Sequence, residues 1–102
     1  MGFTPTRGAF EYIAKAQDPE VTGPELLTLA VHRNSAVRTA VASRPDCPVS
    51  ALISLGHDSD HGVLRALIAN PRTPLSVMRA LADHRNTEIS GSAVQRLRNG
   101  LA

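Results

Sequence analysis

The sequence predicts an all-α protein in which short helices stack side by side as an α-solenoid. Three observations predict this class. A pattern of 26 residues is read about three times along a chain of 102 residues. Its apolar positions are spaced i, i+3 and i+4, as on one face of an α-helix. Its apolar residues are mainly Leu, Ala, Val and Ile, with only three aromatic residues, and such small side chains suit closely packed helices.

The repeat is clearest in two short segments. Residues 29–34 and 81–86 agree at five of six positions and lie 52 residues apart, which is twice 26. The same period aligns several further sets, namely Pro19, Pro45 and Pro71; Leu26, Leu52 and Met78; Asn34, Asp60 and Asn86; and Val37, Val63 and Ile89. We place the units at about residues 18–43, 44–69 and 70–95 of a single domain spanning residues 1–102.

Each unit is predicted to contain two helices, and the first of them begins near a proline. The pairs Cys47-Pro48 and Thr73-Pro74 put proline at the first helical position, where its missing N–H costs least. In the first unit, residues 22–25 read Thr-Gly-Pro-Glu, the spacing of a capping box.

The second helix of each unit is predicted to begin after an Asn or Asp. Asn34, Asp60 and Asn86 have short side-chain acceptors that can satisfy free N–H groups in the first turn. One such helix pair has too little apolar surface to fold alone, so neighbouring units must close the core. A lone helix over residues 6–17 and a longer helix over residues 87–99 are expected to cap the two ends.

Residues 70–83, which read Asn-Pro-Arg-Thr-Pro-Leu-Ser-Val-Met-Arg-Ala-Leu-Ala-Asp, resemble the leucine-rich repeat variant family. Residues 37–42, Val-Arg-Thr-Ala-Val-Ala, are similar to the second half of its unit, and the resemblance covers roughly residues 18–94. It implies a right-handed superhelix of short HEAT-like repeats in a bacterial protein, and a surface that binds other macromolecules. Some members have an N-terminal cysteine cluster, which is not carried over because no cysteine precedes Cys47.

The second unit departs from the family pattern at two places. Residues 44–48 read Arg-Pro-Asp-Cys-Pro where the family has Asn-Pro-x-Thr-Pro, and Gly56 replaces an alanine. These departures predict altered local packing within an unchanged fold.

Composition narrows the functional classes. The single cysteine, Cys47, cannot form an internal disulfide. No apolar run approaches the roughly 18 residues of a membrane span, and residues 1–7 lack the apolar stretch of a signal peptide. We therefore expect a cytoplasmic protein that does not contact membranes.

The sequence predicts neither an enzyme nor a cofactor. His57 and His61 have the i, i+4 spacing of metal ligands, but the repeat places them at a turn capped by Asp60. His32, Asp58 and His84 share one repeat phase and are expected to form a hydrated rim, too widely spaced to bind one ion. Cys47 is expected to be a small, partly buried structural residue. No phosphate loop, nucleophile elbow or metalloprotease motif is present in the sequence.

Binding of another protein is the first functional hypothesis. Leu27 and Ile53 lie about 100° around the helix from the core positions before them. Leu64 is likewise off its stripe, because Arg38 and Ser90 share its phase. These residues are candidates for an exposed apolar patch, with packing between repeats as the alternative reading.

Nucleic-acid binding is the second hypothesis, and both a monomer and a homodimer stay open. Residues 61–102 contain six basic and two acidic residues, whereas residues 1–60 contain five and seven. The basic residues proposed to contact phosphates are arginines, namely Arg65, Arg72, Arg79, Arg85, Arg96 and Arg98. They are not laddered from repeat to repeat, and no aromatic residue accompanies them, which disfavours a base-reading code and single strands.

Overall fold

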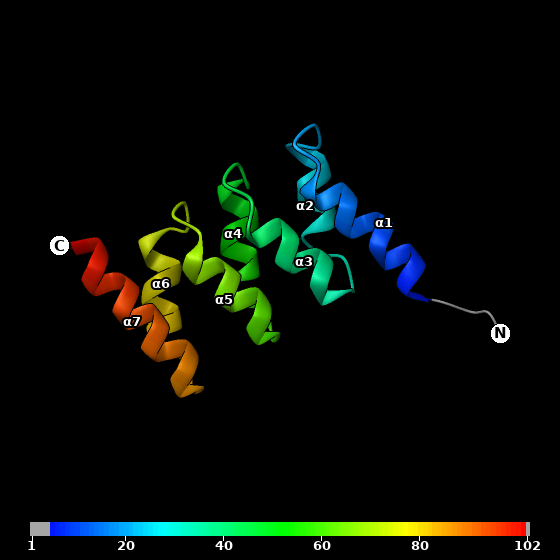
Figure 1. The fold of residues 1–102 in the computed structure, drawn as a ribbon. Coiled ribbons are helices and arrows are strands. Elements are labelled where there is room, and N and C mark those ends of the chain that lie inside the picture. Colours follow the sequence, from blue (N-terminus) through cyan, green and yellow to red (C-terminus); the bar gives the residue numbers. More distant parts are fainter. Residues whose placement is uncertain (1–4, 102) are drawn as a thin grey trace.

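The computed structural model describes residues 5–101, which form α-helices joined by short turns and contain no β-strand (Figure 1). The seven helices of this part of the chain are α1 (Pro5–Gln17), α2 (Pro24–Leu29), α3 (Ser35–Ala42), α4 (Val49–Leu55), α5 (His61–Ala69), α6 (Leu75–Ala82) and α7 (Thr87–Leu101). The all-α class predicted from the sequence is confirmed.

The helices lie in two rows. In Figure 1, α1, α3, α5 and α7 run side by side and form the first row, while α2, α4 and α6 form the second row across it. Each helix of the first row packs on the next, and each second-row helix packs mainly on its first-row neighbours. Helices α1 and α7 therefore lie at opposite ends of the stack (Figure 1).

The core lies between the two rows and follows the period of the sequence. Leu26, Leu52 and Met78 point into it from the second row, and each is at most 1% exposed. The in-phase residues of the first row, Val37, Val63 and Ile89, are 0% exposed. The apolar stripes predicted from the i, i+3, i+4 spacing are therefore the faces that the helices bury.

The predicted caps of the first-row helices are confirmed. The side chain of Asn34 accepts a hydrogen bond from the N–H of Ala36 at 2.8 Å. Asp60 accepts from the N–H of Val63 at 3.2 Å, and this bond starts α5. The Asn86 side chain accepts from the N–H of Ile89 at 3.0 Å. Helix starts are thus set by the local sequence.

The predicted capping box at residues 22–25 is wrong. Helix α2 begins after Gly23, whose φ of +53° is a left-handed conformation that favours glycine, and no side chain caps it. The carboxylate of Glu25 instead pairs with Lys15 of α1 at 2.9 Å, which takes away the side chain that the box requires. Pro48 and Pro74 also lie one residue earlier than predicted, at the cap positions of α4 and α6.

A side-chain donor at one repeat phase joins each first-row helix to the one before it. Arg44 Nη1 donates to the carbonyl oxygens of Ala16, at 2.9 Å, and Asp18, at 2.6 Å. One unit later, Asn70 Nδ2 donates to the carbonyl oxygens of Ala42, at 2.7 Å, and Arg44, at 2.8 Å. In both units the acceptors lie 28 and 26 residues before the donor.

Arg96 makes the equivalent bonds 26 residues after Asn70. Its guanidinium donates to the carbonyl oxygens of Ile68 and Asn70, again 28 and 26 residues earlier. We call Arg44, Asn70 and Arg96 the donor series. Carbonyl groups in the last turn of a helix lack intrahelical partners, and the donor series satisfies one of them in each of α1, α3 and α5, namely those of Ala16, Ala42 and Ile68. The other acceptor of each donor lies in the turn after the helix, where it also accepts a backbone N–H. Arg44 therefore preserves the hydrogen bonds of the asparagine that it replaces in the family pattern, and the altered packing predicted there is wrong on this point.

Candidate functional site

The second row carries exposed apolar side chains. Leu27 is 42% exposed, and Val31, just after the end of α2, is 74% exposed. Helix α4 exposes Val49 (45%) and Ile53 (46%), and α6 exposes Leu75 (52%). We call these five residues the second-row apolar face. Because Leu27 and Ile53 each follow a buried leucine by one position, they project away from the core. Of the two readings left open by the sequence, their exposure favours the exposed patch.

The sequence analysis missed three members of this face. Val31 lies four residues after Leu27, and Val49 lies four residues before Ile53, so each pair shares one side of the chain. Leu75 is in phase with Val49. Both signals are present in the sequence, but only the positions directly after the core leucines were considered as exposed.

A groove of about 270 Å³ lies between α4 and α6. Ile53, Gly56 and His57 line one wall, and the other wall is formed by residues of α6 and the turn after it, namely Ser76, Val77, Ala80, Leu81 and His84. A β-carbon at Gly56 would lie 3.0 Å from Cγ1 of Val77, so the glycine allows the two helices to approach. This contact explains the departure from alanine that the sequence shows at position 56.

A second groove, of about 370 Å³, lies between the carboxyl ends of α2 and α4. Its lining residues are Ala30, Val31, His32, Arg33, Arg38, Ser54, Leu55, His57, Asp58 and Ser59. His57 lines both grooves, so the two hollows are neighbours along the second row.

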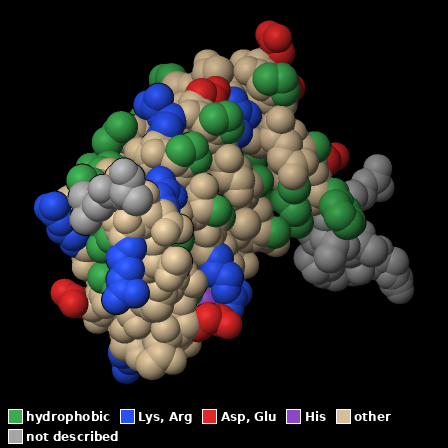
Figure 2. All heavy atoms as spheres, turned by 60° about the vertical axis from the view of Figure 1, so that its left-hand side comes forward, with side chains coloured by type: hydrophobic (Ala, Val, Ile, Leu, Met, Phe, Trp, Pro, Cys, Tyr) green, Lys and Arg blue, Asp and Glu red, His purple; other side chains and the backbone are tan. Residues whose placement is uncertain are grey.

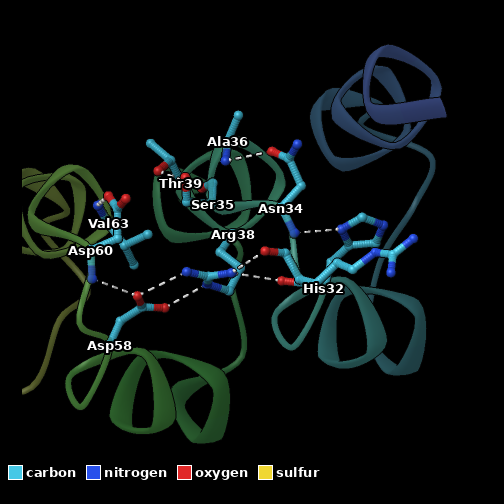
Figure 3. Close-up of polar contacts among 10 residues, drawn as sticks. His32, Asn34, Ser35, Ala36, Arg38, Thr39, Asp58, Asp60 and Val63 are labelled. Atoms are coloured by element: carbon cyan, nitrogen blue, oxygen red, sulfur yellow. Dashed lines mark hydrogen bonds and ion pairs between the residues drawn. The ribbon is translucent and has the colours of Figure 1, made fainter. Parts of the chain in front are cut away.

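An ion pair forms the polar side of this second groove (Figure 3). Arg38 Nε donates to Asp58 Oδ2 at 2.6 Å, and Nη2 donates to Oδ1 at 3.0 Å. Arg38 Nη1 also donates to the carbonyl oxygens of His32 and Arg33. Burial raises the pKa of Asp58, but the hydrogen bonds from Arg38 and from the N–H of Asp60 outweigh it and hold that pKa below its ordinary value.

Leu64 contradicts the prediction of an exposed patch residue, because it is 1% exposed and belongs to the core. Arg38 occupies the same phase and reaches out to Asp58, which led the sequence analysis to place Leu64 on the surface. Arg38 binds the carboxylate of Asp58, which lies 20 residues later in the chain. The residue 20 positions after Leu64 is His84, which is not a carboxylate. The aliphatic side chain of Leu64 is instead buried with the core residues of α5.

The predicted phosphate-binding arginines do not form one patch. Arg65 on α5 pairs with Glu88 of α7, and Arg96 belongs to the donor series. Arg72 lies in the turn before α6, Arg79 on α6 and Arg85 in the turn before α7, and all three are exposed. In Figure 2, the Lys and Arg side chains of this face are separated by other atoms and do not form a continuous stripe.

The histidines and Asp58 have structural roles that the sequence analysis did not predict. Nδ1 of His32 accepts a hydrogen bond from the N–H of Asn34 at 3.0 Å, and Nδ1 of His84 accepts from Asn86 at the same distance. Asp58 accepts from the N–H of Asp60 at 2.9 Å. The phase predicted as a hydrated rim therefore closes the turn before each first-row helix.

Cys47 is 0% exposed and lies in the core, deeper than predicted. Burial raises the pKa of its thiol to about 11, so that the thiol is protonated at neutral pH. Among the described residues, no group of three or more His, Cys, Asp or Glu side chains is placed to hold a metal ion. None of the helices in residues 5–101 is long and apolar enough to cross a membrane.

The two rows, the periodic core and the donor series all follow the 26-residue period of the sequence. Residues 36–60, which run from the first turn of α3 to the cap of α5, match the family model described as leucine rich repeat variant. This match supports, over these residues, the family resemblance found in the sequence. Comparisons with the curated proteins and with the solved structures gave no match.

Proposed function

We propose that this protein is a non-enzymatic right-handed α-solenoid that binds another protein through the second-row apolar face. In this account the repeats span about residues 18–43, 44–69 and 70–95, and α1 and α7 cap the stack. The repeat family supports a scaffold role. The equal spacing of the bonds made by the donor series supports the repeat count, because each bond links equivalent positions of neighbouring units.

The observation that carries the binding site is the exposure of Ile53 beside a groove. Ile53 is 46% exposed on α4 and lines the hollow between α4 and α6. Val49 is exposed one turn before it, and Leu75 extends the apolar surface onto α6. Contiguous exposed apolar side chains beside a concave surface are typical of sites at which a protein anchors its partner.

The absence of enzymatic activity is supported by the roles of the reactive side chains. His32 and His84 use Nδ1 to close turns, and Asp58 is bound by Arg38. The Cys47 thiol lies in the core. These groups stabilise helices and turns, which leaves a surface for recognition as the function that the geometry favours.

Nucleic-acid binding is less well supported. Arg65 and Arg96 are engaged within the protein, and Arg72, Arg79 and Arg85 lie on three different elements. A basic stripe along one face is the usual footprint of a nucleic-acid partner, and these positions do not provide one.

The experiment is an affinity capture that compares three forms of the immobilised protein. Ile53→Asp places a charge in the α4–α6 groove, whereas Ala14→Asp places the same charge at an exposed position on α1 as the control. We expect a protein retained by the wild type and by Ala14→Asp to be lost from Ile53→Asp, and purified components to reproduce this difference by calorimetry.

Equal retention by all three forms would contradict the proposed surface. Salt-sensitive binding to duplex DNA or single-stranded RNA, measured by fluorescence anisotropy and lost when Arg72, Arg79 and Arg85 become alanine, would favour the nucleic-acid alternative instead.

A further inference from the structure

The two second-row grooves are lined by more basic than acidic side chains. Among the described residues that line them, the titratable ones are Arg33, Arg38, His32, His57, His84 and Asp58. Asp58 is the one acid of this lining set, and its two carboxylate oxygens accept from Arg38. The charges of Arg38 and Asp58 therefore cancel. The side chains left are one arginine and three histidines, which we call the groove bases (Arg33, His32, His57 and His84).

Two further carboxylates lie near the grooves in the chain but line neither of them. Asp60 caps α5, and its charge acts on Arg38, whereas Asp83 lies at the end of α6. The grooves therefore combine apolar walls with an excess of basic and hydrogen-bond-donating side chains.

Two of the groove bases have a fixed tautomer. His32 and His84 each accept a backbone N–H at Nδ1, so their neutral rings carry the proton on Nε2. The free side of each ring is consequently a hydrogen-bond donor without any need for protonation. A carboxylate is an acceptor only, and it is the partner group that such donors and the Arg33 guanidinium both suit.

The apolar walls of the grooves suit apolar side chains on the same partner. Val31 is 74% exposed at the α2–α4 groove, and Ile53 is 46% exposed at the α4–α6 groove. Neighbouring packed helices are about 8–10 Å apart, so a partner that fills both grooves has apolar side chains at about that spacing. An α-helix provides this separation two turns apart, and an extended strand provides it three residues apart.

We propose that the two grooves bind an acidic amphipathic segment of the partner protein. Its apolar side chains enter the grooves against Val31, Ile53 and Val77, and its Asp and Glu side chains meet the groove bases. This inference rests on the proposed function and adds to it the chemistry of the partner.

The test uses the full chain and three pools of fluorescein-labelled 12-residue peptides. The pools share the same Leu and Phe positions and differ in the remaining positions, which are Asp and Glu, Lys and Arg, or Ser and Gln. We expect the acidic pool to bind at least about tenfold more tightly than the other two by fluorescence anisotropy, and its binding to weaken from low to physiological salt.

Charge-reversal variants assign the effect to the grooves. Arg33→Glu is expected to lower the affinity for the acidic pool by about tenfold or more. Arg98→Glu is the matched control, because Arg98 is exposed on α7 and lines neither groove, and it is expected to leave binding unchanged. Circular dichroism of both variants checks that they keep the fold.

Three outcomes would overturn the proposal: equal or tighter binding of the basic or uncharged pool, equal effects of the two arginine variants, or no binding of any pool. Binding of an uncharged pool that Ile53→Asp abolishes would leave the protein-binding function intact while removing the acidic partner. Failure of the capture experiment would remove the function itself.

Discussion

The donor series shows that one structural task can be met by different residues. Asn70 reaches the two carbonyl groups of the preceding helix with a short amide, whereas Arg44 and Arg96 reach the equivalent groups with a guanidinium. What the three side chains share is a planar end that carries N–H donors. Asn70 in addition accepts at Oδ1 from the N–H of Arg72 at 2.9 Å. Sequence comparison alone treats Asn and Arg at this position as unrelated, so the equivalence becomes visible only from the bonds.

Asn70→Ala is expected to lower the free energy of unfolding. Asn70 is 3% exposed, and its loss leaves the Ala42 carbonyl without this partner, at a cost of roughly 1–3 kcal/mol. The Arg44 carbonyl keeps the hydrogen bond from the N–H of Cys47. Urea denaturation measures the difference. The exposed Asn99→Ala serves as the control, and Asn70→Arg is expected to retain more stability than Asn70→Ala. Equal losses for the two Asn70 variants would contradict the donor series.

Gly56 and Val77 are expected to be energetically coupled. The equivalent pair one repeat earlier is Ala30 and Ala51. Relative to that pair, Gly56 is smaller and Val77 is larger, and the space left by the glycine is occupied by the valine. Gly56→Ala should be more favourable in a Val77→Ala background than in the wild type, by on the order of 0.5–1 kcal/mol. Denaturant unfolding of the four proteins of the double-mutant cycle measures this coupling. A value of zero would mean that the side chains do not compete for space.

At the scale of the elements, side-chain hydrogen bonds in the turns between the rows define where the helices α3, α5 and α7 begin. Each first-row helix α3, α5 and α7 begins with an Asn or Asp cap, and the residue two positions earlier closes the turn. The caps were predictable from the sequence, because Asn and Asp have a known preference for this position. The role of His32, Asp58 and His84 was not, since a histidine becomes an acceptor only when its ring is turned toward a backbone N–H.

Asp58 is expected to contribute to stability in a pH-dependent way. Its pKa in the folded protein lies below the ordinary value of 3.8, so its contribution is fully present above that value and is lost as the pH falls through the folded pKa. Asp58→Asn should therefore lower stability at neutral pH and make the loss of stability on acidification less steep than in the wild type. Thermal unfolding between neutral pH and about pH 3 checks this. Parallel acid limbs for the two proteins would contradict the ion pair with Arg38.

The sequence predicted the elements better than it predicted the surface. Helical spacing located the core stripes, since Leu26 and Leu52 are buried where the pattern places them. The exposure of Leu64 was predicted wrongly because a polar residue, Arg38, lies at the same repeat phase. The position of the Arg38 side chain depends on its ion pair with Asp58, which lies in a different turn. Long-range pairs of this kind, such as Arg38 with Asp58, follow from how units stack and leave no local pattern.

At the scale of the whole molecule, the same contacts recur between successive helices along the stack. Each first-row helix packs on the next, and the donor series links neighbouring units at a constant separation. In a stack of this type, stability is approximately the sum of unit and interface contributions. The second-row apolar face follows this repetition in part, because Leu27 is in phase with Ile53 and Val49 with Leu75, whereas Val31 is in phase with His57.

Removal of one complete unit is expected to preserve the fold. Deleting residues 44–69 joins Ser43 to Asn70, which then occupies the place of Arg44 and faces the carbonyl groups of Ala16 and Asp18. We expect this variant to keep a cooperative helical transition at a lower midpoint, because it loses one interface. Deleting half a unit, residues 44–56, breaks the phase and should abolish the transition. Circular dichroism during heating distinguishes them, and equal unfolding of both variants would contradict the repeat architecture.

Site-specific photo-cross-linking tests the central claim, that the second row is the partner-binding surface, most directly. A photoreactive phenylalanine analogue is placed at position 53 in the α4–α6 groove, or at the exposed position 14 on α1, and each protein is irradiated in cell extract. The account predicts a discrete protein adduct from position 53 that position 14 does not form and that competing unlabelled protein suppresses. An adduct of the same protein from position 14 alone, or adducts of equal yield from both, would contradict it.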